Sequence, residues 1–161
     1  EGDTVALDLG LKHKGLFTDM AITVPVGKIG RESAELIKVT REALERGISD
    51  ARAGNTVGDI GNTVQRFVER QGYNVVRNLC GHGIGKELHE DPQIPNFGKR
   101  HIGAPLQEGM VICIEPMVTA GDWKLEKMAD GFGFVTKDHS LSCHFENTIA
   151  ITANGSEVLT K

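Results

Sequence analysis

The sequence predicts an α+β fold, and the order of its expected elements is the main reason. Two strand-like segments come first, two helical segments follow, and strand-like segments fill most of the remainder of the 161 residues. This order differs from the regular strand–helix alternation of a parallel α/β protein. The length corresponds to about one domain.

The first two segments, residues 4–11 and 15–24, are rich in residues that favour β-structure. The short sequence KHK at residues 12–14 lies between them and is expected to form the turn. We therefore expect the chain to begin with a β-hairpin.

Two helices are predicted next, over residues 33–51 and from about residue 55 to Gly72. In both segments apolar residues recur at helical spacing, and Thr56 with Asp59 forms a capping box at the start of the second helix. Gly72 is placed to end it. The two apolar stripes are Leu36, Ile37, Val39, Leu44 and Ile48, and then Val57, Ile60, Val64, Phe67 and Val68.

The second half of the sequence has strand-like segments at residues 74–77, 110–118, 132–136 and 142–152. Residues 79–92 form a glycine-rich loop in this interpretation. Residues 91–108, rich in Pro and Gly, are expected to be irregular, and Asn154-Gly155 to form a hairpin turn.

Composition excludes several classes of function. A net charge of −4 argues against binding to nucleic acid, and no apolar run approaches the length of a membrane span. The three cysteines (Cys80, Cys113 and Cys143) are widely spaced, and no secretion signal is recognisable. Free thiols of this kind indicate a reducing compartment, so we expect a cytoplasmic protein.

Four acidic residues lie inside the apolar strand-like segments, where acidic residues are uncommon. They are Asp8, Asp19, Glu115 and Glu146. One such residue is readily explained as a solvent-facing position on an edge strand. Four that converged without partners would repel one another by about 4 kcal/mol per pair at 4 Å and a dielectric constant of 20. These strands contain no Lys or Arg, so divalent cations are the expected partners.

His82 supplies a neutral nitrogen ligand for such cations. It lies in the sequence CGHGIG, where glycines leave room around the imidazole. Oxygen-rich ligation with one imidazole suits Mn, Fe, Co or Zn. Two ions that share bridging carboxylates would activate a water molecule for hydrolysis.

The sequence does not match other common catalytic motifs. GHGIGK is one residue too short for a phosphate-binding loop, and Glu87 stands where Ser or Thr is required. His89-Glu90 lacks the second histidine of a zinc-protease helix. A Cys80 thiol nucleophile remains an alternative, although it lies too close to His82 in sequence for the two side chains to face each other easily.

The chain resembles the type I methionine aminopeptidases, a family with the pita-bread (creatinase/aminopeptidase) fold, over essentially its whole length. The matching segments are Leu7-Asp8, Thr18-Asp19, the CGHGIG loop at 80–85, His89-Glu90, Pro92-Gln93, Ile114-Glu115-Pro116-Met117 and Phe145-Glu146-Asn147-Thr148-Ile149. The resemblance implies a curved antiparallel sheet backed by helices. It also implies removal of the N-terminal (initiator) methionine from nascent proteins, with association with the ribosome as a possibility.

The resemblance also implies roles for single residues. Asp8 would chelate one of two divalent ions, Asp19 and Glu146 would bridge both, and His82 with Glu115 would hold the second. Glu115 would in addition transfer a proton. His89 would lie near the substrate carbonyl, or on the surface if it has no role. Leu88 and Phe132 would contribute to the methionine pocket.

The family has a further N-terminal portion that carries much of this pocket. Residues 1–161 are therefore expected to form one catalytic domain that corresponds to the C-terminal two-thirds of a pita-bread domain. The missing strands would leave a sheet edge open for self-association. The alternatives are another pita-bread peptidase, namely a prolidase or an X-Pro aminopeptidase, and a truncated metal-binding scaffold with little activity.

Overall fold

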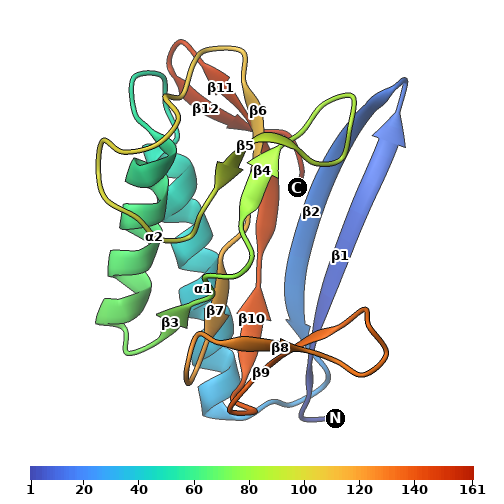
Figure 1. Cartoon of the computed structure of the whole chain (residues 1–161). Coiled ribbons are helices and arrows are strands. Elements are labelled where there is room, and N and C mark those ends of the chain that lie inside the picture. The colour runs from blue at the N-terminus through green and yellow to red at the C-terminus, as the bar shows by residue number, and fades with distance from the viewer.

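The chain begins with the predicted β-hairpin, in a computed structural model that describes all 161 residues (Figure 1). Strand β1 (Thr4–His13) pairs with β2 (Leu16–Pro25) in antiparallel register. The turn consists of Lys14 and Gly15, both with positive φ, as a two-residue hairpin turn requires. The turn therefore begins two residues later and ends one residue later than the predicted turn at residues 12–14, because Gly15 adopts the left-handed conformation without steric cost.

Seven antiparallel strands form the main sheet. Their order is β1-β2-β11-β6-β4-β5, and β12 pairs with the free end of β11. The later strands are β4 (Gly81–Gly83), β5 (Glu90–Ile94), β6 (Val111–Ile114), β11 (Glu146–Thr152) and β12 (Gly155–Val158). The hairpin expected at Asn154-Gly155 is present, but its turn lies one residue earlier, at Ala153-Asn154, and Gly155 pairs with Thr152 as the first residue of β12.

Two smaller sheets lie beside the main one. The first has the order β10 (Ser142–His144), β7 (Met117–Thr119) and β3 (Asn74–Val75). The second is the hairpin of β8 (Leu125–Lys127) and β9 (Phe134–Thr136), which projects beside β1 in Figure 1. Strand β8 was not predicted.

Two segments that were predicted as single strands are each divided between two sheets. Residues 110–118 become β6 and β7, with Glu115 and Pro116 between them, and residues 142–152 become β10 and β11, with Phe145 between them. Pro116 has no N–H to donate to a sheet, so the ladder is interrupted there. As a result, the two predicted ligands Glu115 and Glu146 both lie where the chain passes from one sheet to another.

The segment around His82 is a strand rather than the predicted loop. Gly81 pairs with Ile94, and Gly83 pairs with both Glu90 and Ile112. These partners lie 7 to 29 residues away in the sequence, beyond the reach of local propensity. Residues 90–94, expected to be irregular, form β5 for the same reason.

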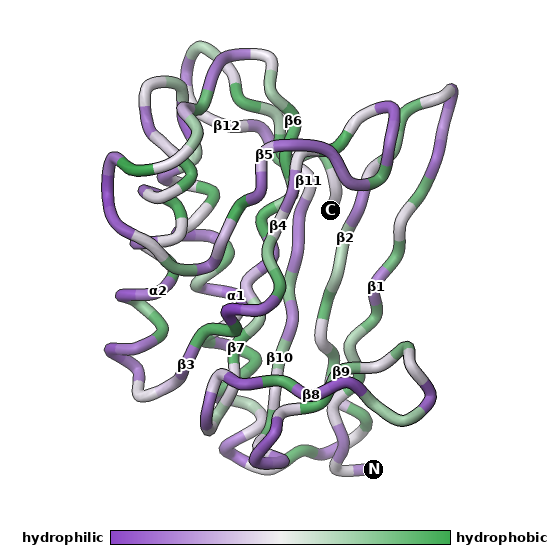
Figure 2. The backbone as a smooth tube through the Cα atoms, in the orientation of Figure 1, coloured by the Kyte–Doolittle hydropathy of each residue, from purple (hydrophilic) through white to green (hydrophobic).

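Helices α1 (Arg31–Asp50) and α2 (Val57–Arg70) lie on one side of the main sheet (Figure 1). The capping box is confirmed: the Thr56 N–H donates to Asp59 Oδ2 over 2.8 Å. Both predicted apolar stripes supply buried residues to the core, although Ile37, Ile48 and Phe67 are only partly buried. Figure 2 shows apolar stretches on the central strands and hydrophilic stretches on the outer turns of α2. Neither helix combines the length and the hydropathy that crossing a membrane requires.

Candidate metal centre

Three of the predicted acidic ligands lie on one face of three adjacent strands. Asp8 and Glu146 are both directly opposite Ala21, one on each side of it, and Asp19 precedes Ala21 by two residues. Directly opposed residues, and residues two apart on one strand, point to the same face of a sheet. The small, fully buried side chain of Ala21 leaves space for the carboxylates. Oxygen atoms of Asp8, Asp19 and Glu146 accordingly lie within 4.8 Å of one another.

His82 reaches the same face from the centre of β4, and its neighbouring glycines make this possible. A Cβ atom on Gly81 would overlap the carbonyl oxygen of Cys113, and one on Gly83 would overlap that of Asp91. The backbones on both sides of β4 therefore pack directly against it. Gly81 and Gly83 are therefore required for close packing of the strand that carries His82.

The imidazole of His82 is oriented for ligation by its Nε2 atom. Its Nδ1 lies 2.9 Å from the carbonyl oxygen of Gly83, so Nδ1–H donates and Nε2 keeps its lone pair. Nε2 faces three carboxylates, at 3.6 Å from Glu115 Oε1, 3.8 Å from Glu146 Oε1 and 4.0 Å from Asp19 Oδ2. Two donors that bind one ion at about 2.1 Å each lie at most about 4.2 Å apart, so all three distances permit a shared ion.

The electrostatics of these carboxylates call for a cation. Burial, together with the charges of Glu115 and Asp19, raises the pKa of Glu146 to about 9. Burial and the charge of Asp8 raise the pKa of Asp19. Glu146 Oε1 is buried and has no hydrogen-bond partner. The residues that line the adjoining cavity include no Lys or Arg, so the residues present fit divalent metal ions.

The predicted ligands thus form two overlapping groups. Asp8, Asp19 and Glu146 make one. His82 makes the other with the three carboxylates around its Nε2, which belong to Asp19, Glu115 and Glu146. Asp8 differs from the others, because its side chain is 56 % exposed whereas theirs are at most 13 % exposed. Strand β1 is the edge of the sheet, and its residues are exposed except for the half-buried Thr4.

Polar groups that the sequence interpretation did not identify hold the ligands in place. The Thr148 hydroxyl accepts from the Asp19 N–H and donates to the Asp19 carbonyl, both over 2.8 Å. The Asn96 side chain donates to the Glu115 carbonyl over 2.9 Å. Thr148 lies two residues after Glu146 on the same strand face, so period-two alternation could have indicated it.

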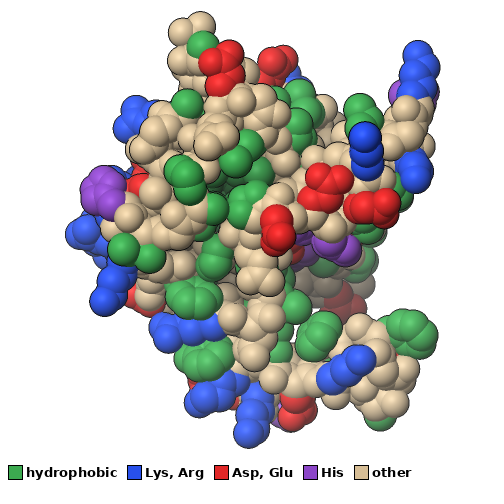
Figure 3. All heavy atoms as spheres, turned by 45° about the horizontal axis from the view of Figure 1, so that its top comes forward, with side chains coloured by type: hydrophobic (Ala, Val, Ile, Leu, Met, Phe, Trp, Pro, Cys, Tyr) green, Lys and Arg blue, Asp and Glu red, His purple; other side chains and the backbone are tan.

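A cavity of about 610 Å³ opens beside the centre. Its lining includes Asp8, His82, His89 and Glu115, and the His89 ring lies edge-on to that of His82 with centroids 4.4 Å apart. Figure 3 shows histidine and acidic side chains in a hollow between the β1–β2 hairpin and the β8–β9 hairpin. His89 is exposed and can therefore contact a bound molecule.

The two predicted pocket residues do not line this cavity. Leu88 packs against Gly10, and Phe132 is 90 % exposed on the loop between β8 and β9. Their role in substrate binding stays a prediction. A smaller apolar cavity of about 170 Å³, lined in part by Leu125 and Phe134, adjoins the first and shares Met117 with it.

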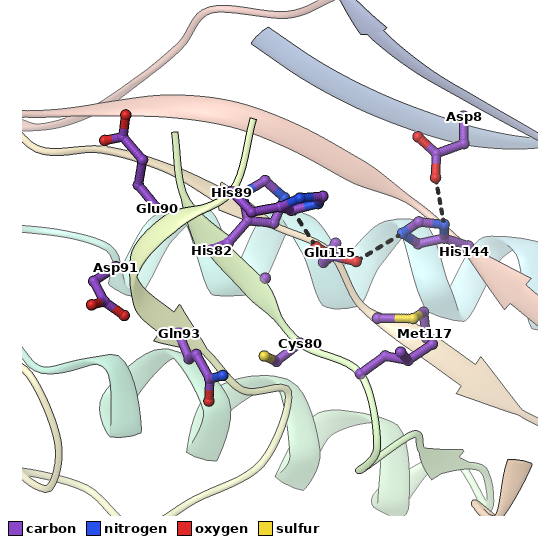
Figure 4. A pocket seen from close by; sticks show the side chains of 12 residues that line it. Asp8, Cys80, His82, His89, Glu90, Asp91, Gln93, Glu115, Met117 and His144 are labelled. Atoms are coloured by element: carbon purple, nitrogen blue, oxygen red, sulfur yellow. Dashed lines mark ion pairs between the residues drawn. The ribbon is translucent and has the colours of Figure 1, made fainter. Parts of the chain in front are cut away.

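His144 is a further residue at the centre that sequence reasoning missed. Figure 4 shows its ring between Asp8 and Glu115, in a row that runs from His82 through Glu115 and His144 to Asp8. It precedes Glu146 by two residues, and that spacing was the only signal available in the sequence.

Several known proteins are similar to this chain in sequence and fold. Residues 1–153 match metallopeptidase family M24. A methionine aminopeptidase of Clostridium perfringens is 46 % identical over 160 residues, which are 99 % of this chain and 64 % of the relative. The crystal structure of a methionine aminopeptidase from Thermotoga maritima superposes with a TM-score of 0.98 at 48 % identity, over 100 % of this chain and 65 % of that one. A prolidase from Pyrococcus furiosus superposes with a TM-score of 0.79 at 28 % identity, over 99 % of this chain and 42 % of the prolidase.

These matches extend over nearly the whole chain, which spans about two-thirds of the length of the methionine aminopeptidases named above. They agree with the pita-bread fold implied by the resemblance: a curled antiparallel sheet with two helices. The sequence match over residues 1–153 and the agreement in fold show that the chain belongs to metallopeptidase family M24.

Proposed function

We propose that this chain carries the metal centre of a methionine aminopeptidase, which hydrolyses the peptide bond after an N-terminal methionine. The observation that supports it best is the convergence of Asp8, Asp19, His82, Glu115 and Glu146 on one face of the sheet. Asp19 and Glu146 are buried, Glu115 is only 13 % exposed, and no Lys or Arg lines the cavity beside them. Relatives named methionine aminopeptidase, at 46 % and 48 % identity, favour this substrate class over a prolidase.

Asp8, Asp19 and Glu146 would hold one divalent ion, and His82 and Glu115 would hold a second that shares Asp19 and Glu146. Co, Mn, Fe and Zn all suit this mixed oxygen and nitrogen donor set. Such ions, when bound, lower the pKa of water and polarise a carbonyl group.

Two side chains of this centre, those of Glu115 and His89, would act on the substrate. Glu115 lies at the cavity wall with its Oε1 turned toward His82, so it can accept a proton from the attacking water and pass it to the leaving amine. His89 stands at the open side and can donate a hydrogen bond to the substrate carbonyl oxygen as negative charge develops there.

The test is methionine release from the peptide Met-Ala-Ser by the purified 161-residue chain, with and without Mn or Co. We expect metal-dependent release that Glu115→Gln abolishes. A parallel assay with an X-Pro dipeptide separates the prolidase alternative, since preferential cleavage of that substrate would contradict the proposal. Binding of ions without release of any residue would instead support the metal-binding scaffold with little activity.

We also expect the chain to self-associate through β1. This edge strand is ten residues long, and its exposed side chains include Leu7, Leu9 and Leu11. Unpaired backbone groups next to exposed leucines favour pairing with a second chain. Sedimentation velocity at tens of micromolar checks this, and a monodisperse monomer would show the expectation to be incorrect.

The proposed activity implies an encounter with nascent polypeptides, and hence a position near the ribosome in the cytoplasm. The three unpaired cysteines, two of them buried, are consistent with a reducing compartment. Both points stay predictions.

A further inference from the structure

The Glu115 carboxylate lies between two imidazoles, one at each oxygen. His82 Nε2 is 3.6 Å from Oε1, and His144 Nε2 is 3.5 Å from Oε2 (Figure 4). The first contact belongs to the metal centre described above. The second has no role in the proposed function so far.

His144 has a polar atom that lacks a partner. Its Nε2 is buried and makes no hydrogen bond in this structure. The only carboxylate oxygen in ion-pair contact with Nε2 is Oε2 of Glu115. The other ring nitrogen, Nδ1, lies 3.9 Å from Oδ2 of Asp8. A neutral imidazole has a single N–H, which can serve only one of these two carboxylates.

Burial decides which carboxylate it serves. The Asp8 side chain is 56 % exposed and can take hydrogen bonds from water, whereas the Glu115 side chain is only 13 % exposed. A buried acceptor left without a donor costs more than an exposed one. The tautomer with hydrogen on Nε2, facing Glu115, is therefore more favourable than the tautomer with hydrogen on Nδ1, facing Asp8.

The backbone of His144 is fixed independently of its ring. The Thr23 hydroxyl donates to the His144 carbonyl over 2.8 Å and accepts from the His144 N–H over 3.1 Å. His144 is also paired with Met117 between β10 and β7. The backbone that carries the ring is thus held by Thr23 on one side and by Met117 on the other.

We propose that His144 is a positioning residue for Glu115. By donating Nε2–H to Oε2, it holds the carboxylate so that Oε1 faces His82 and the ion that the two would share. The inference rests on the proposed metal centre and adds a supporting hydrogen bond to one of its ligands. Supporting partners of this kind typically change metal affinity by about 10–100-fold.

A role as a metal ligand is the competing possibility for His144. Its ring is in ion-pair contact with Asp8 at 3.9 Å and Glu115 at 3.5 Å, but not with Asp19 or Glu146, the two carboxylates proposed to hold both ions. An ion bound to His144 Nε2 would have Glu115 as its only other side-chain ligand among the ion-pair contacts of this nitrogen. The geometry points to a hydrogen-bond donor instead.

Two substitutions place an amide N–H at one ring nitrogen or at the other. In His144→Gln the amide nitrogen can occupy the position of Nε2, facing Glu115. In His144→Asn it occupies that of Nδ1, facing Asp8. We expect calorimetric titration with Mn to give parental affinity for both ions in His144→Gln. In His144→Asn, the affinity for the ion at His82 and Glu115 should fall by about 10–100-fold. The visible spectrum of the Co-loaded chain should change with Asn only.

His13→Gln, at the exposed end of the β1–β2 hairpin, is the matched control, and circular dichroism confirms folding of each variant. Parental affinity in both His144 variants would overturn the positioning role and leave the proposed function intact. Equal losses in both would overturn it as well, because they would indicate that the imidazole itself is needed. A parental chain that binds no ion would contradict the proposed metal centre, and with it this inference.

Discussion

Replacement of Glu146 by Gln is expected to weaken divalent-ion binding by more than about 100-fold while raising the melting temperature of the metal-free chain. Loss of a supporting hydrogen bond alone costs up to about 100-fold, and Glu146 is a proposed ligand of both ions, so its loss should cost more. Methionine release should fall at least as far. The effect on stability has the opposite sign, because this carboxylate is 2 % exposed, lacks a hydrogen bond to Oε1 and lies near three other acids.

Calorimetric titration with Mn measures the first effect, and thermal unfolding in EDTA at pH 8 measures the second. Glu157→Gln makes the same chemical change at an exposed position of β12 and should alter neither. Retained ion affinity in Glu146→Gln would show that Glu146 is not a shared ligand. A lower melting temperature in EDTA would show that the carboxylate has a favourable partner in the metal-free chain.

The second large effect is a pH dependence of stability that metal ions remove. Burial and the neighbouring acids raise the pKa of Glu146 from 4.5 to about 9, so between these values the folded state holds a proton that the unfolded state has lost. The contribution of this group to stability is complete below about pH 4.5 and disappears as pH rises through about 9. The raised pKa of Asp19 acts in the same direction. The metal-free chain should therefore become less stable from pH 5 to pH 9.

Bound ions should reverse this trend, because they bind the ionised carboxylates and compete with protons. At 1,000 times the dissociation constant, one ion contributes about 4 kcal/mol, which corresponds to roughly 8–16 °C for a chain of this size. Melting curves from pH 5 to 9 in EDTA and in Mn measure the difference, which should grow with pH. Glu146→Gln in EDTA isolates the contribution of this group from that of the six histidines. A difference that stays constant with pH would exclude the proton-linked mechanism.

The local part of the fold could be predicted because its signals are local. Apolar residues at helical spacing and the Thr56–Asp59 capping box placed α1 and α2 to within about two residues at most ends. Strands β4 and β5 could not be predicted in this way. Their short, glycine-containing segments have little preference for β-structure, and they become strands only by pairing with β6 and with each other.

The same distinction holds for the site. Four acids within apolar segments and one histidine among glycines indicated a metal centre, since acidic residues are uncommon in such surroundings unless a positive partner is present. Leu88 and Phe132 were inferred from the resemblance alone, and the structure places neither in the cavity beside the ligands. The position of a side chain on a loop such as that of Phe132 is decided by contacts that no spacing in the sequence records.

The sequence by itself determined the fold class, the two helices and the residues proposed to bind metal, because each follows from residue type and short-range periodicity. Only the tertiary structure decided that the strand segments divide at Pro116 and Phe145, that Asp8 stays exposed on an edge strand, and that His144 faces Glu115. These features depend on backbone hydrogen bonds and packing between segments as far apart as Thr23 and His144. Such long-range contacts form only when the whole sheet is assembled.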